Sequence, residues 1–122
     1  MLLDAPEKIH KRLGPDRDDI TQAAVSAASA TTHTIIAAPA AGSRIVVIGW
    51  WIRGEAVNRF EWKIGATSYG DDAYMEAYRV YQDRGTTSSP VFRLPEATPL
   101  QLVTQAADLV SGYVTYFVEE VG

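Results

Sequence analysis

The chain has 122 residues, of which 47% are hydrophobic, enough for one domain with a packed core but too few for two. The absence of cysteine excludes disulfides, thiolate chemistry and cysteine-rich zinc sites. The net charge of −4 argues against a nucleic-acid partner, and no apolar run approaches the roughly 18 residues that cross a bilayer, which argues against a membrane partner.

The first 19 residues differ in composition from the rest of the chain. They are rich in charge and are interrupted by Pro6, Gly14 and Pro15, so we expect an extended N-terminal arm (1–19) before a single domain (20–122). Two interpretations stay open, a disordered terminus and an arm that docks on a neighbouring protein. In the docking hypothesis the apolar anchors are Leu2, Leu3, Ile9 and Leu13, and the basic contacts are Lys8, Lys11 and Arg12.

From Ile20 onward β-branched and aromatic residues dominate and turn residues recur at short intervals, which predicts strands. The segment 20–30 suits a helix by its alanines and an edge strand by its Thr, Val and Ser residues, and we favour the extended form. A strand is expected at 31–38, followed by a turn over Pro39–Gly42.

The segment 44–53 is apolar at both parities, as in a strand covered on both sides. Strict alternation places Val46, Ile48, Trp50 and Ile52 on one face and Ile45, Val47 and Trp51 on the other. In so small a domain, the second cover is expected to be another subunit or a folded-over loop.

The segment 57–65 alternates between apolar Phe60, Trp62 and Ile64 and charged Arg59, Glu61 and Lys63, which predicts one buried and one wet face. Further strands are expected at 74–81, 91–94, 99–104 and 110–120. Seven or eight short strands with no long helix predict an all-β fold, an antiparallel β-sandwich or jelly roll.

Aromatic residues are the main candidates for contacts. Tyrosine and tryptophan are enriched at interfaces, but they are equally ordinary as half-buried strand residues. The candidates for the core or a subunit interface are Trp50, Trp51, Phe60, Trp62, Tyr74, Tyr78 and Tyr116.

The sequence offers little for catalysis. His10 and His33 have no second histidine at metal-ligand spacing, and no phosphate loop or serine elbow occurs. Asp71 and Asp72 follow Gly70 and could supply oxygen ligands to calcium, although the spacing of a calcium loop is missing and turn chemistry is the simpler reading. We therefore expect no enzyme activity, no cofactor and no metal.

Two stretches carry a family resemblance. In the run Thr34–Gly49, a strand ends in Ala-Ala-Pro, a turn of small residues follows, and Arg44 leads into a long apolar strand. The segment Leu94–Leu100 then precedes a polar strand, and Gly112, Val114 and Tyr116 form a closing Gly-x-Val-x-Tyr strand. This pattern resembles the β-sandwich proteins of bacteriophage virions.

The resemblance implies a capsid decoration or cement protein, a structural protein that binds the outer shell and staples neighbouring coat subunits. Its implied partner is the major capsid protein, its implied state a homotrimer, and its location the capsid surface after synthesis in the host cytoplasm. The charged arm and a Tyr-rich insertion between Gly65 and Pro90 depart from the pattern, and the arm favours decoration.

The alternative is a carbohydrate- or receptor-binding module of a phage tail or fibre. Its stacking platform would be drawn from Trp51, Tyr69, Tyr74 and Tyr78. Exposed aromatic residues that converge on one surface would favour this alternative.

Overall fold

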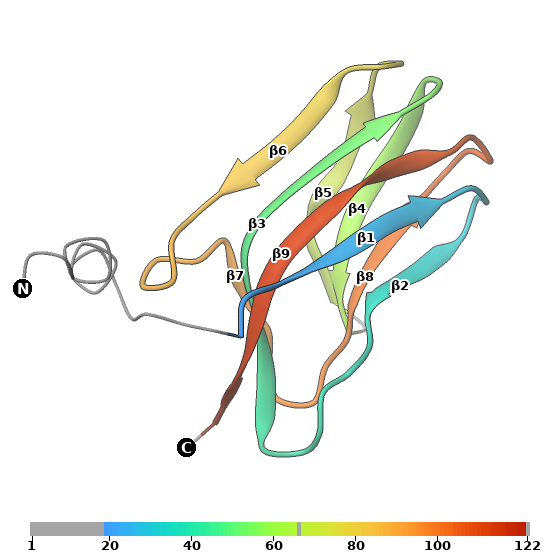
Figure 1. Cartoon of the computed structure of the whole chain (residues 1–122). Coiled ribbons are helices and arrows are strands. Elements are labelled where there is room, and N and C mark those ends of the chain that lie inside the picture. The colour runs from blue at the N-terminus through green and yellow to red at the C-terminus, as the bar shows by residue number, and fades with distance from the viewer. Residues whose placement is uncertain (1–18, 66, 122) are drawn as a thin grey trace, which may run out of the picture.

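The computed structural model describes residues 19–65 and 67–121, without the side chains of 69–72. The described chain forms nine strands in two antiparallel sheets packed face to face (Figure 1). Sheet A has the order β1 (Thr21–Ala27), β9 (Val110–Glu120), β3 (Ser43–Gly54) and β6 (Val80–Arg84), and β7 (Phe92–Arg93) also pairs with β3. Sheet B has the order β2 (Thr32–Ile36), β8 (Leu100–Thr104), β4 (Asn58–Ile64) and β5 (Thr67–Met75).

The strand order is that of a jelly roll. β6 pairs with residues 49–53 of β3 and β7 with residues 46–47, so the two short strands share one position in sheet A. Counted in this way, the fold has eight strand positions in two sheets of four, the number typical of a jelly roll. The expected all-β sandwich is therefore confirmed.

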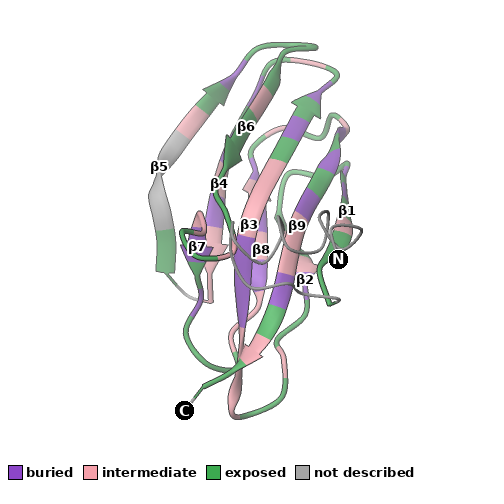
Figure 2. Cartoon of the chain, turned by 60° about the vertical axis from the view of Figure 1, so that its left-hand side comes forward, coloured by how far each residue is buried: buried purple, intermediate pink, exposed green. Residues whose placement is uncertain are grey.

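The core lies between the two sheets and is built from alternate residues of their strands. Apolar side chains alternate with exposed ones along β1, β4 and β9, as Figure 2 shows in the banding of buried and exposed residues. Burying each large aliphatic side chain contributes about 1.5–3 kcal/mol. The fully buried core residues include Ile45, Val47, Ile52, Met75, Leu100, Leu102, Val110 and Val114.

The strict alternation expected for β3 is wrong, because the strand contains a β-bulge. Val47 lies opposite Tyr116 and Gly49 opposite Thr115, so Ile48 is an extra residue in the pairing with β9. One extra residue inverts the parity of everything after it. Ile45 and Val47 therefore face the core before the bulge, and Trp50 and Ile52 face it after the bulge.

The single strand expected at 74–81 is also wrong. β5 ends at Met75 in sheet B, and β6 begins at Val80 in sheet A. Between them Tyr78 takes a positive φ of 60°, and its N–H donates to the carbonyl of Gly54 at 2.8 Å. The Glu76 N–H donates to the Tyr81 hydroxyl at 2.8 Å, which fixes the crossing between the sheets.

The turn expected over Pro39–Gly42 is confirmed. The Ser43 N–H donates to the Ala40 carbonyl at 3.0 Å, and Gly42 has a φ of 89°, a conformation that glycine adopts without steric cost. This turn leads directly into β3 and ties it to the other end of the chain, because the Val121 N–H donates to the Gly42 carbonyl at 2.7 Å.

Asn58 is a buried polar residue that organises the β8–β9 loop. Its Oδ1 accepts hydrogen bonds from the N–H groups of Arg59, Gln105 and Ala106, at 2.8, 3.1 and 2.9 Å. Its side-chain amide donates to the Ala106 carbonyl at 3.3 Å. Asn58 is 3% exposed, and this set of partners satisfies its amide where water does not reach.

Gly112 allows β3 and β9 to approach closely. A Cβ at this position would overlap the carbonyl oxygen of Trp51 and would lie 2.9 Å from the Cα of Ile52. We predict that Gly112→Ala destabilises the fold by about 3 kcal/mol, the upper part of the usual cost of overpacking. Urea unfolding followed by tryptophan fluorescence measures the loss.

The matched control is Ser111→Ala, at an exposed neighbouring position of the same strand. It is expected to change the unfolding free energy by no more than about 0.5 kcal/mol. Equal unfolding midpoints for the Gly112 and Ser111 variants would contradict the close approach.

Candidate functional site

The two outer faces of the sandwich differ in chemistry. The outer face of sheet B carries the charged residues Arg59, Glu61 and Lys63 of β4, which alternate with its buried residues. The outer face of sheet A carries two large exposed aromatic residues, Trp51 and Tyr113, on its two central strands. Sheet A therefore presents the face with the stronger potential for binding.

The side chains on this face follow from the strand register. One row across sheet A runs Ala24, Tyr113, Trp51 and Gln82 on β1, β9, β3 and β6. The next row, in the same order of strands, runs Gln22, Thr115, Gly49 and Arg84. Because Gly49 has no side chain, the second row has a gap at its centre.

A solvent-open hollow of about 350 Å³ occupies this gap. Trp51 and Tyr113 border it on one side, Gln22 lies towards the β1 edge, and Gln82 and Arg84 lie towards the β6 edge. The remaining lining residues are Ile48, Gly49, Trp50, Asp83, Gly85 and Thr115. We call this feature the sheet A hollow.

Trp51 and Tyr113 form a pair of rings at the hollow. They are opposite each other in the register, with ring centroids 5.8 Å apart and an angle of 53° between the ring planes. Their exposed fractions are 37% and 44%, so part of each ring stays open to a ligand. Tilted aromatic pairs of this spacing are mutually stabilising, which holds both rings in place.

The polar side chains at the two edges are free to bind. Within the described chain, no hydrogen bond or ion pair engages the side chains of Gln22, Gln82 or Arg84. Asp83 lies between Gln82 and Arg84 on the opposite parity of β6, where its carboxylate accepts a hydrogen bond from the Arg84 N–H at 2.8 Å, and its backbone borders the hollow. The hollow thus combines aromatic rings with amide and guanidinium groups.

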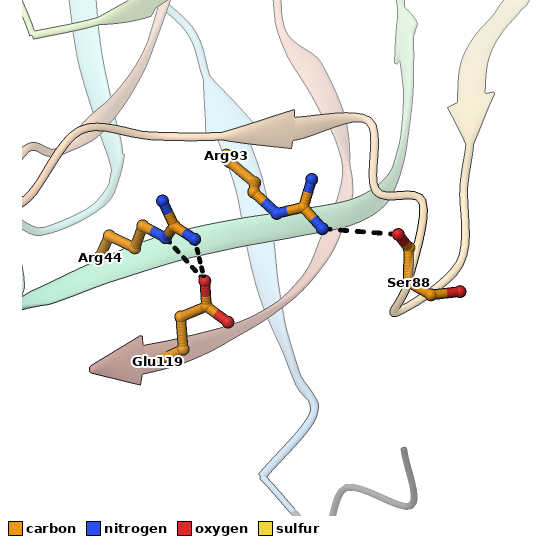
Figure 3. Close-up of polar contacts among 4 residues, drawn as sticks. All are labelled: Arg44, Ser88, Arg93 and Glu119. Carbon is orange, nitrogen blue, oxygen red and sulfur yellow. Dashed lines mark hydrogen bonds and ion pairs between the residues drawn. The ribbon is translucent and has the colours of Figure 1, made fainter. Parts of the chain in front are cut away.

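Towards the start of β3 and the end of β9, the outer face of sheet A carries apolar side chains that are buried. Val46 and Phe117 are paired in the register, and both are buried although they lie on the side opposite the core. Next to them, the Arg44 Nε donates to Glu119 Oε2 at 2.6 Å, and a second Arg44 nitrogen lies 2.5 Å from that oxygen (Figure 3). Arg93 of β7 donates to the Ser88 carbonyl at 3.4 Å (Figure 3).

The structure separates the aromatic residues singled out in the sequence. Phe60 and Trp62 are buried in the core, and Trp50 and Tyr116 pack against it while partly buried. Trp51 is exposed on sheet A, whereas Tyr74 pairs with Arg59 on the outer side of sheet B. Tyr78 lies in the β5–β6 turn, with the Arg53 guanidinium 5.2 Å from its ring centre.

The expected stacking platform is therefore only partly assembled. Trp51 lies on the outer face of sheet A and Tyr74 on the outer face of sheet B, so the two rings are on opposite sides of the sandwich. The side chain of Tyr69 is outside the described part of the chain. The residue that joins Trp51 is Tyr113, which was not singled out from the sequence. Its parity in β9, opposite to that of Val110 and Val114, is the signal that would have found it.

Several other predictions fall outside the described residues. The docking arm is one of them, with Leu2, Leu3, Lys8, Ile9, Lys11, Arg12 and Leu13, and so are the side chains of Asp71 and Asp72. Among the residues that are described, no group of three or more His, Asp or Glu side chains is placed to hold a metal ion. His33 makes a hydrogen bond between its Nε2 and the Ser29 carbonyl at 2.8 Å.

Within residues 19–65 and 67–121, no helix is long and apolar enough to span a membrane. Comparison with protein-family models, with curated proteins and with solved structures found no match. The resemblance to phage virion proteins stays a prediction from the sequence.

The Arg44–Glu119 ion pair at the end of the outer face of sheet A allows a test of its contribution to stability. Both arginine contacts go to one carboxylate oxygen, and the side chains are 33% and 26% exposed. We predict a coupling free energy of about 0.5–1 kcal/mol in a double-mutant cycle of Arg44→Ala and Glu119→Ala. Thermal or urea unfolding of the four proteins gives the value, which falls as salt is added.

The control is the Arg79–Glu76 pair, which is longer at 3.5 Å and more exposed at 64% and 56%. Its coupling is expected to be close to zero, because solvent screens exposed pairs. A larger coupling for this second pair than for Arg44–Glu119 would refute the assignment.

Proposed function

We propose that the protein is a structural component of a bacteriophage particle, a decoration or cement protein that binds the major capsid protein as a homotrimer on the outer shell. The observation that carries the proposal is the jelly-roll strand order, because viral capsid domains commonly use this architecture. Jelly rolls also occur in lectins, so the fold supports the class of protein by analogy, and the sequence pattern around Thr34–Gly49 supports the phage context.

A second observation concerns the end of the sandwich where β1 begins and β9 ends. Ile20, Val118 and Val121 are exposed there at 41%, 38% and 40%. The β2–β3 and β7–β8 loops meet at this end, where the Gly42 N–H donates to the Glu96 carboxylate at 2.6 Å. β1 begins at Thr21 near this end, which supports the proposal that residues 1–19 and these exposed apolar residues act on one partner surface.

The proposed action is additive. Each copy buries area on neighbouring coat subunits, and many copies together stabilise the shell without any chemical step. The affinity of a single contact does not follow from its area, since pairs of equal size differ widely in affinity. The tail- or fibre-associated binding module stays the alternative function.

The proposal predicts that the chain without residues 1–19 remains trimeric but loses particle binding. Light scattering gives the native mass of both chains, and co-sedimentation with particles that lack this protein gives the binding. A shortened chain that binds particles as tightly as the full chain would overturn the role of the arm.

A pair of matched variants tests the docking end itself. Val121→Asp places a charge among the exposed apolar residues at the termini, whereas Val57→Asp places one on a 54% exposed valine of the β3–β4 loop at the opposite end. We expect Val121→Asp to weaken particle binding at least about tenfold, or about 1.4 kcal/mol, and Val57→Asp to have little effect. The reverse order would contradict docking through the termini.

A further inference from the structure

We propose that the sheet A hollow is a saccharide-binding site that takes a pyranose ring of a glycan chain against Trp51 and Tyr113. This inference goes beyond the capsid role and uses the middle of the outer face of sheet A, away from the exposed residues at the termini. Decoration of a shell with this protein would then display one sugar site per copy.

The rings supply the first requirement of a sugar site. One side of a pyranose presents C–H groups and is apolar, so it packs against an aromatic ring that is held still and partly open to solvent. Trp51 and Tyr113 meet both conditions, since they hold each other at 5.8 Å and keep 37% and 44% of their surface exposed. An isolated exposed ring such as Tyr74 lacks a described ring partner to fix it.

The polar side chains supply the second requirement. Sugar hydroxyls donate and accept hydrogen bonds, and the hollow has amides that do both, at Gln22 and Gln82, together with the guanidinium of Arg84. Binding breaks no contact of the Gln22, Gln82 and Arg84 side chains within the described chain. These polar groups beside two aromatic rings suit a hydroxyl-rich ligand better than a purely apolar one.

The dimensions agree with one ring or a short glycan. The volume of about 350 Å³ is at the lower end of the range for small-molecule sites, which starts at about 300 Å³. The β1 and β6 edges are three strand spacings apart, or about 14 Å, which leaves both ends open for a chain to continue. Gly49 forms the floor, so the ligand approaches the backbone of β3 directly.

Gly49 also provides the sharpest variant. An added Cβ would meet only the Asp83 carbonyl at 3.5 Å and the Arg84 Cα at 4.0 Å, which are ordinary contacts. Valine suits a strand and would raise the floor without overlapping the backbone. Gly49→Val therefore removes the space for the ring while it keeps the fold.

The experiment is an NMR titration of the full chain with cellotetraose, N-acetylchitotriose, maltotriose and lactose, followed through the indole N–H signal of Trp51 and the side-chain amides of Gln22 and Gln82. We expect at least one saccharide to shift these signals saturably with a Kd of about 1 mM or tighter. We expect Gly49→Val and Gln82→Ala each to weaken that binding at least about fivefold, or about 1 kcal/mol.

Tyr74→Ala is the control, because it removes an exposed aromatic ring from the other sheet. It should leave the Kd within about twofold, which is less than 0.5 kcal/mol. If Gly49→Val unfolds, Gln82→Ala on the exposed edge strand β6 still decides the result. No shift with any of the four saccharides, or binding that both variants leave unchanged, overturns the site whether or not the protein binds capsids.

Discussion

The rest of the structure depends on the β-bulge at Ile48 in β3. This strand is central in sheet A, where it pairs with β9 on one side and with β6 and β7 on the other. Its sequence is apolar on both parities, and the bulge lets Ile45 and Val47 before it and Trp50 and Ile52 after it enter the same core. A regular strand that kept Ile45 and Val47 in the core would turn Trp51 and Arg53 inward and leave Trp50 and Ile52 outside.

The bulge also determines which side chains of β3 lie on the outer face of sheet A. Gly49 and Trp51 point away from the core because they follow the bulge, and register then places them beside Thr115 and Tyr113. The hollow is therefore the gap at Gly49 between two edges of polar residues, with the ring pair alongside. A feature that stabilises the core thus also creates the candidate binding surface, and bulges commonly occur where a side chain must be redirected.

Much of the fold follows from the sequence through local rules. The alternation in β4 and the turn before β3 were predicted correctly because each depends on a few neighbouring residues, such as Phe60, Trp62 and Gly42. The faces of β3 were not, because a bulge depends on pairing with β9, more than 60 residues later in the chain, and leaves no local mark among residues that are all apolar. The crossing at Tyr78 was missed for a similar reason, since its turn is fixed by Gly54 on another strand.

In the candidate site too, the sequence indicated single residues but not the long-range strand pairing that brings them together. Trp51 was singled out from the sequence, but Tyr113, Gly49 and Gln22 join it only through the register of four strands. Residues on neighbouring strands that are distant in the chain meet through long-range pairing, which composition and spacing do not specify. The arm and the proposed capsid contacts depend on residues 1–19 and on a partner protein.

The most direct test of the account is the hydrogen exchange of the three indole N–H groups, each assigned by its own Trp→Phe variant. The parity of β3 after the bulge predicts slow exchange for Trp50, whose Nε1 is buried, and fast exchange for Trp51, which is 37% exposed on the outer face. Trp62 of β4, whose Nε1 is also buried, is the slow reference. Fast exchange at Trp50 with protection at Trp51 would mean that β3 keeps the parity of Ile45 and Val47 to its end without a bulge, and the hollow at Gly49 would not exist.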